Sequence, residues 1–164
     1  MKINGRKIEG PNEEIIPIPR GNGDDIILTV RAILDMEPFD KMCPPPVPPV
    51  KKIKGTDIPQ LNDKNYVKAV TKFAEKRMAW MVITSLEATE GLEWEQVDKN
   101  DFSTWPLFRK EMTEAGFSDV EIGRVIAGVT SVNALSEIKI QAARERFLLS
   151  RQAQLDDLSS QKDG

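Results

Sequence analysis

Short stretches of alternating apolar and polar residues dominate the first 36 residues and predict β-strands there. In the stretch from Asp25 to Leu34, Ile26, Leu28 and Val30 occupy every second position, which is the period of a strand with one buried face. The Asn4-Gly5 pair stands between two short β-prone segments. Such a pair tolerates positive φ at both central positions of a tight turn, so it predicts a β-hairpin near residue 1.

The stretch from Glu13 to Arg20 also has an extended pattern, but Pro17 and Pro19 alternate within it. Proline has no N–H to donate, so this strand can pair fully on only one side. The sequence therefore predicts an edge strand. The Gly21-Asn22-Gly23 segment that follows lacks the third glycine of a phosphate-binding loop, and we interpret it as a turn between strands.

The pattern changes to a helical period after residue 61. Asn62 or Asp63 can cap a helix that runs to about Leu86. From Ala79 to Ile83 this helix is apolar on every side. Such a segment must be enclosed by the chain's own fold or by a partner.

Further helices are predicted downstream. Ser103 or Thr104 can cap a short helix that ends before Gly116, where a glycine allows the left-handed stop. The segment Ser118-Asp119-Val120-Glu121 has the spacing of a capping box, in which the serine and the glutamate satisfy each other's backbone N–H groups. It starts a helix that we expect to end at Asn133.

A proline-rich segment separates the strands from the helices. The run Pro44-Pro45-Pro46-Val47-Pro48-Pro49 favours polyproline II, because each ring fixes φ and each residue before a proline avoids the helical region. The Pro46 to Lys51 segment also fits the pattern of ligands of SH3 domains. We interpret the whole segment as a semi-rigid spacer.

Together these patterns predict an α+β chain with an N-terminal arm, made of a β-hairpin or small sheet, then a proline-rich spacer and a C-terminal bundle of about four helices. Ser136 can cap the last helix, which we expect to reach about Asp157. The expected regions are a β-rich N-terminal region 1–36, a proline-rich linker 37–61, a helical domain 62–157 and a disordered tail 158–164.

The residue types present exclude several kinds of catalytic chemistry. The chain has 164 residues with no histidine and a single cysteine, Cys43. It can therefore form neither a Ser-His-Asp or Cys-His site nor a zinc site of Cys and His. The acidic residues around Trp94 would leave only a metal-dependent carboxylate site, and their spacing matches no calcium loop. We expect no enzymatic activity, no cofactor and no bound metal.

Charge and hydropathy narrow the range of partners. The formal net charge is −3, which gives no electrostatic footprint of nucleic-acid binding. The most apolar run, Ala79 to Ile83, is far too short to cross a bilayer, and the first residues do not resemble a secretory signal. We therefore expect a cytoplasmic protein that binds other proteins rather than nucleic acid, membranes or a small-molecule substrate.

Aromatic and methionine side chains gather between residues 73 and 112, and they are the candidates for contact with a partner protein. Methionine adapts its shape to varied apolar partners. Core positions remain expected for Trp80 and Trp105, whereas Trp94 stands in an acidic loop and should be partly exposed. The candidate partner-binding residues are Phe73, Met78, Trp80, Met81, Trp94, Trp105, Phe108 and Met112.

A set of caps, turns and aromatic residues in the second half is similar to a known family. The segments are Glu90-Gly91-Leu92-Glu93-Trp94-Glu95, Ser103-Thr104-Trp105-Pro106, Glu114-Ala115-Gly116-Phe117-Ser118, Asn133-Ala134-Leu135-Ser136, Ala143-Arg144 and Phe147-Leu148. With this pattern, the region from Tyr66 to Leu149 resembles the tail assembly chaperones of long-tailed, siphophage-type bacteriophages.

The resemblance implies a protein that works in the infected cell and leaves before the virion is complete. Proteins of this family bind the long, apolar, helical tape-measure protein, keep it soluble and help tail-tube subunits to polymerise around it. Many are made in a short form and in a frameshift-extended form. We also expect self-association, because the N-terminal edge strand and the segment from Ala79 to Ile83 need cover.

Other functions remain open at this point. The main alternative is a structural tail or neck subunit that stays in the virion, because an edge strand and a spacer suit a subunit that reaches its neighbour. An adaptor role through the proline-rich segment is a further alternative. The sequence does not identify the host, the oligomeric state, the surface that binds the partner or the existence of an extended form.

Overall fold

The structure, a computed structural model, describes residues 1–8, 10–21, 23–134, 140–141 and 143–151. The chain divides into two compact units, Met1–Asn133 and Ala134–Gly164. Within the described residues of the first unit, three two-stranded antiparallel sheets combine with helices. The α+β class predicted from the sequence is therefore confirmed.

The strands of the first 36 residues form as predicted. Strands β1 (Lys2–Ile3) and β2 (Arg6–Lys7) flank Asn4 and Gly5, whose φ angles are 51° and 76°. Strands β3 (Glu13–Ile18) and β4 (Ile26–Arg31) pair antiparallel. One face of this β3–β4 sheet is buried, and it carries Ile16, Ile18, Leu28 and Val30.

Strand β3 is an edge strand. The hydrogen bonds of β4 show which residues of β3 turn their backbone groups away from β4. Thr29 donates its N–H to Thr89 Oγ1 at 2.9 Å, and that hydroxyl donates to the Thr29 carbonyl at 2.9 Å. The backbone of Thr29 therefore points away from β3. This direction alternates from one residue to the next in an antiparallel pair, so Ile27, two positions from Thr29, also points away from β3. Pro17 lies opposite Ile27 and therefore points away from β4. Its missing N–H costs no bond within the sheet.

Helix α2 (Lys64–Leu86) is the longest element described and has two different halves. Asp63 caps it by accepting the N–H groups of Asn65 and Tyr66, each at 2.9 Å. The second half is buried: Trp80 and Ile83 are each 1% exposed. The apolar segment from residue 79 to 83 is thus enclosed by the chain's own fold, which removes one of our two reasons for expecting self-association.

A short helix that the sequence analysis missed supplies much of this enclosure. Helix α1 (Glu37–Met42) lies inside the predicted spacer and places Phe39 in the core with no exposed surface. The Phe39 ring lies 5.5 Å from Phe73, 5.6 Å from Trp80 and 5.9 Å from Trp105. Proline in the first turn is compatible with a helix, so Pro38 does not prevent it.

The predicted linker 37–61 is therefore not a spacer throughout. After α1, residues 43–49 form neither helix nor strand. Strands β5 (Val50–Ile53) and β6 (Thr56–Pro59) then form a hairpin around Lys54 and Gly55, whose φ angles are 50° and 83°. A lysine in this left-handed conformation is uncommon, which is why the turn was not recognised from the sequence.

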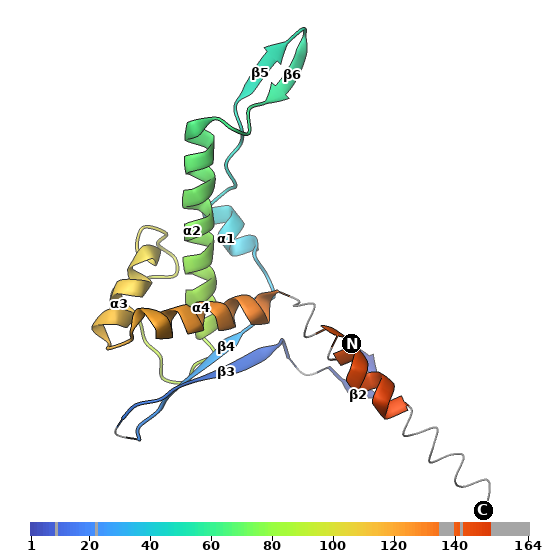
Figure 1. Ribbon diagram of the computed structural model, residues 1–164, viewed down its shortest axis with the longest axis vertical. Helices are drawn as coiled ribbons and strands as arrows, with labels where there is room; N and C mark the ends of the chain where they lie inside the picture. The colour runs from blue at the N-terminus through green and yellow to red at the C-terminus, as the bar shows by residue number, and fades with distance from the viewer. Residues whose placement is uncertain (9, 22, 135–139, 142, 152–164) are drawn as a thin grey trace, which may run out of the picture. The chain divides into compact units, whose positions relative to one another are not determined.

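The helical region also differs from the expected bundle. A 3-10 turn, η1 (Trp105–Leu107), leads into α3 (Phe108–Glu114), and Thr104 makes no side-chain cap to it. Figure 1 shows α4 (Asp119–Asn133) crossing the lower part of α2, with the β3–β4 sheet against it. These helices therefore pack against the β3–β4 sheet as well as against one another, and do not form a bundle of helices alone.

In the second unit, residues 140–141 and 143–151 are helical. The predicted cap at Ser136, the end of that helix near Asp157 and the predicted tail 158–164 lie outside the described residues.

Two side-chain networks fix helix α4. Ser118 donates its N–H to Glu121 at 2.8 Å and its hydroxyl at 2.9 Å, so the predicted capping box is present. At the other end, Asn133 accepts the Ile33 N–H at 2.8 Å and donates to Ser85 Oγ at 3.0 Å. Asn133 thus joins α4 both to α2 and to the segment that follows β4.

Two glycines of α4 provide a matched test of its close packing on the sheet. A methyl group on Gly128 would overlap Ile16 Cδ1 and lie 3.2 Å from Ile16 Cγ1, whereas one on Gly123 would meet nothing within 4 Å. We expect Gly123→Ala to stabilise by about 0.5–1 kcal/mol through helix propensity. Gly128→Ala should be less stable than Gly123→Ala by about 1–3 kcal/mol, because the core must shift.

Urea denaturation of both variants and the wild type measures this difference. If Gly128→Ala is as stable as Gly123→Ala, the close approach of α4 to the β3–β4 sheet is wrong.

The capping box should also make the free energy of unfolding depend on pH. The pKa of Glu121 is lowered from 4.5 to about 2. The largest cause is the hydrogen bond from the Ser118 backbone N–H, followed by the hydrogen bonds from Arg20 and from the Ser118 hydroxyl. A carboxyl with a lowered pKa in the folded state stabilises it above its unfolded pKa. This contribution should be complete above pH 4.5 and lost as the pH falls towards 2.

The test compares wild type with Glu121→Gln by urea denaturation between about pH 3 and pH 7. The stability difference between them should be largest near neutral pH and should shrink on acidification. Asp119→Asn is the control, because it removes a charge from the same turn but not from the capping box. A Glu121→Gln difference that is constant over this range would contradict the assignment.

Candidate partner-binding surfaces

Half of the predicted partner-binding residues belong to the core. Trp80 is 1% exposed, Trp105 is 0%, Phe108 is 4% and Met112 is 5%. Trp105 also donates its Nε1–H to the Lys99 carbonyl at 3.0 Å, inside the fold. The core positions expected for Trp80 and Trp105 are confirmed, and in this conformation all four side chains are packed inside the fold. Size and hydrophobicity mark core and binding residues alike.

The other predicted residues lie at the border between core and solvent. Phe73, Met78, Met81 and Trp94 are all half-buried. Phe73 packs on Phe39, whereas Trp94 lies in the loop between α2 and η1. The expectation that Trp94 is partly exposed is confirmed.

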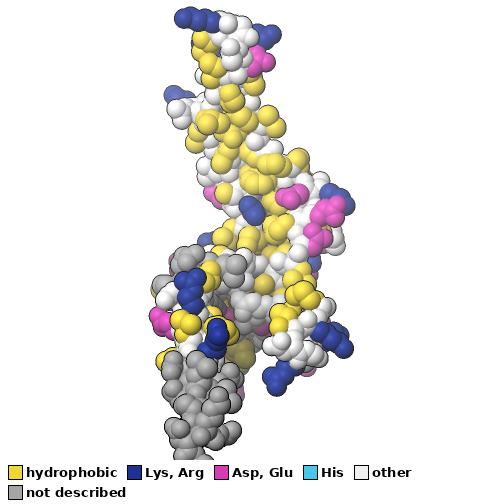
Figure 2. All heavy atoms as spheres, turned by 90° about the vertical axis from the view of Figure 1, so that its right-hand side faces the viewer, with side chains coloured by type: hydrophobic (Ala, Val, Ile, Leu, Met, Phe, Trp, Pro, Cys, Tyr) yellow, Lys and Arg dark blue, Asp and Glu magenta, His cyan; other side chains and the backbone are white. Residues whose placement is uncertain are grey.

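The first exposed surface is the basic extension, which we define as residues 50–77, the β5–β6 hairpin with the first half of α2. It projects from the core at the upper end of Figure 1. Figure 2 shows apolar side chains along this part of the first unit, with basic side chains at its end. The exposed apolar residues of the extension are Val50, Ile53, Ile58, Leu61, Val67 and Val70.

Within the extension, α2 presents an apolar stripe on one face and lysines on the opposite face. Tyr66, Val70 and Phe73 recur at helical spacing, and Val67 adjoins them. Val67 is 49% exposed and Val70 is 38% exposed. The stripe follows the helical period of the sequence, whereas the hairpin was not expected, because the prolines before residue 50 suggested a spacer.

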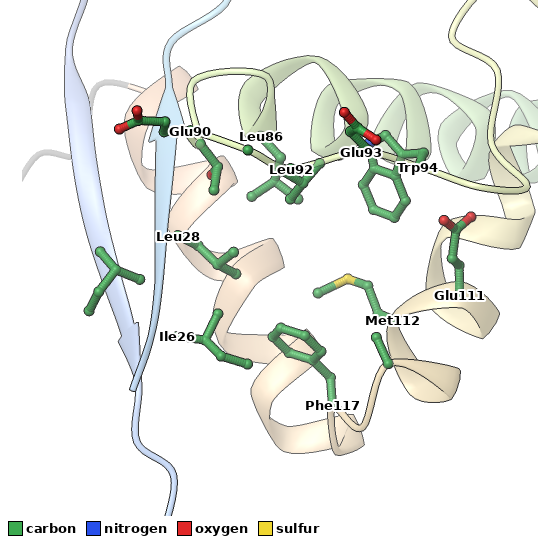
Figure 3. A pocket seen from close by; sticks show the side chains of 14 residues that line it. Ile26, Leu28, Leu86, Glu90, Leu92, Glu93, Trp94, Glu111, Met112 and Phe117 are labelled. Carbon is green, nitrogen blue, oxygen red and sulfur yellow. The ribbon is translucent and has the colours of Figure 1, made fainter. Parts of the chain in front are cut away.

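The second surface is the Trp94 pocket, a cavity of about 360 Å³ between β4, the end of α2, the following loop and α3. Figure 3 shows apolar side chains that converge on it, with the Trp94 ring above Met112. Its apolar lining includes Ile26, Leu28, Leu86, Leu92, Met112 and Phe117. The carboxylates of Glu90, Glu93 and Glu111 lie at its margin.

Hydrogen bonds hold the loop that forms one wall of this pocket. The Glu111 carboxylate accepts the N–H of Gln96 at 3.0 Å and also that of Glu95. The Thr89 hydroxyl forms hydrogen bonds with the backbone N–H and carbonyl of Thr29 in β4. The Trp94 Nε1–H is buried and has no hydrogen-bond partner among the described residues. The pocket is therefore a preformed apolar hollow with an acidic margin.

In the described ranges, no group of three or more His, Cys, Asp or Glu residues is placed to hold a metal ion. Across the same residues, no helix has the length and apolar character needed to cross a membrane. The arrangement that the structure presents is suited to apolar contact, with basic charge on one surface and acidic charge on the other.

Comparison with protein-family models found no match, and searches of curated proteins and of solved structures likewise found no similar protein.

Proposed function

We propose that the protein is a tail assembly chaperone of a long-tailed bacteriophage. In this role it binds the tape-measure protein in the host cytoplasm, keeps it soluble and helps tail-tube subunits to assemble around it. The observation that carries the proposal is the exposed apolar stripe of α2 in the basic extension. The resemblance of the region from Tyr66 to Leu149 to that family gives the stripe its expected partner.

The stripe has the properties needed to hold an apolar helix. Tyr66, Val70 and Phe73 lie on one side of a rigid helix, so they can pack along a partner helix as anchors at i and i+4 or i+3. Lys68 and Lys72 lie on the opposite face of the helix, and their charges favour the solubility of the extension. Rigidity reduces the entropy lost when a partner binds.

The second candidate is a structural tail or neck subunit that remains in the virion. It is favoured by the exposed β5–β6 hairpin, since the outer backbone groups of its strands can pair with a neighbouring subunit. The two functions differ in the finished particle. A chaperone is absent from purified virions, whereas a subunit is present in a fixed ratio.

The chaperone proposal is tested by co-expression with the tape-measure protein of the same genome. We expect the wild-type chain to keep the tape-measure protein soluble. Val67→Ser combined with Val70→Ser should abolish most of this rescue, because it removes the apolar stripe from positions that are not part of the core.

The matched control is Leu34→Ser combined with Val120→Ser. These residues are 83% and 81% exposed and lie outside the extension. The control should retain the rescue. The proposal is wrong if wild type does not solubilise the tape-measure protein, or if both double variants rescue it equally well.

A further inference from the structure

The β5–β6 hairpin is an uncovered element. All residues of both strands are exposed, and an isolated two-stranded hairpin is marginally stable in water. Lys51 lies opposite Ile58, and Ile53 lies opposite Thr56. These residues share one face, because side chains two positions apart point the same way. The hairpin therefore presents Ile53 and Ile58 together with a lysine.

The Trp94 pocket has complementary properties. Its volume of about 360 Å³ falls in the range of small binding pockets, and its apolar walls suit aliphatic side chains. Glu90 and Glu93 at its margin are exposed, and neither forms an ion pair with another described residue. The same holds for Lys51 and Lys54 of the hairpin.

The charge of the chain is divided between these two regions. Residues 50–77 contain eight Lys or Arg and three Asp or Glu. Residues 87–121, which run from the loop after α2 through η1 and α3 to the first turn of α4, contain three Lys or Arg and ten Asp or Glu. Surfaces with opposite potentials attract each other and disfavour partners of like charge.

The hairpin cannot reach the pocket of its own chain. It precedes Lys64 at the start of α2, whereas Leu86 at the end of α2 lines the pocket. A helix of 23 residues is about 34 Å long at a rise of 1.5 Å per residue. The pocket is therefore available only to the hairpin of another molecule.

We propose that the Trp94 pocket binds the β5–β6 hairpin of a second copy of this chain. Ile53 and Ile58 enter the apolar hollow, while Lys51 and Lys54 face Glu90 and Glu93. The contact joins two different surfaces, so it is a head-to-tail association that can form a ring or a filament. It goes beyond the proposed function and does not depend on it.

Charge reversal tests this proposal on the purified full chain, with sedimentation velocity over a range of concentrations. The wild type should associate more strongly at low ionic strength, because salt screens exposed charges. Lys51→Glu with Lys54→Glu should weaken association about tenfold or more, and so should Glu90→Lys with Glu93→Lys. Lys2→Glu with Lys7→Glu, in the other exposed hairpin, is the control and should behave like wild type.

Combining the variants gives a sharper result. Neither variant should associate strongly with itself, but a mixture of the hairpin variant and the pocket variant should associate with alternating copies, because each hairpin then meets a pocket of opposite charge. A chain that carries all four reversals should associate again. Circular dichroism of each variant checks that it remains folded.

Three outcomes would overturn the proposal: a wild type that stays monomeric at every concentration, association that the reversals do not change, or a mixture that does not associate. If the wild type is monomeric and the pocket variant alone loses the rescue of the tape-measure protein, the pocket belongs to that partner instead. Because the sedimentation assay contains no tape-measure protein, its result is independent of the chaperone proposal.

Discussion

The burial of the second half of α2 is the interaction on which the rest of the first unit depends. Trp80 packs against Phe39, and the Phe39 ring also contacts Trp105, so one aromatic cluster joins α1, α2 and η1. The β3–β4 sheet is only two strands wide and needs a helix on its buried face to be stable. Helix α4 provides it, with Gly128 against Ile16, and Asn133 ties α4 back to α2.

This arrangement leaves the first half of α2 outside the core. The helix is long enough to project past the elements that cover it, and the hairpin before it is exposed on both strands. Basic residues accompany this projecting part, whereas acidic residues surround the Trp94 pocket. The core side chains thus pack on one another, and the surfaces that we propose for binding are the ones that the core does not cover.

Sequence patterns were informative wherever one local rule decided the structure. The alternation at Ile26, Leu28 and Val30 defined β4, and the capping box at Ser118 and Glu121 defined the start of α4. Sequence patterns were misleading wherever contacts between residues far apart in the chain determined the structure. Helix α1 forms around Phe39, whose partners at Phe73, Trp80 and Trp105 are far along the chain, so no local pattern reveals it.

The two candidate surfaces differ in the same way: one lies on a single element, and the other is formed by several elements. The stripe of Tyr66, Val67 and Val70 follows from helical periodicity, because it lies on one element. Trp80, Trp105 and Phe108 were candidates for contact with a partner, with core positions expected for the two tryptophans, and all three are buried. Composition alone does not tell the inside of a fold from an apolar surface. The Trp94 pocket combines residues of β4, α2 and α3, so only the folded chain brings it together.

Hydrogen–deuterium exchange with and without the tape-measure protein tests most directly whether the core is self-sufficient and the extension binds the partner. In the free protein, amides of residues 50–70 should exchange much faster than those of residues 79–86, because exchange follows local burial and stability. Addition of the partner should slow exchange in residues 64–75 and leave residues 79–86 unchanged. Protection confined to the core, or no protection in the extension, would contradict the account.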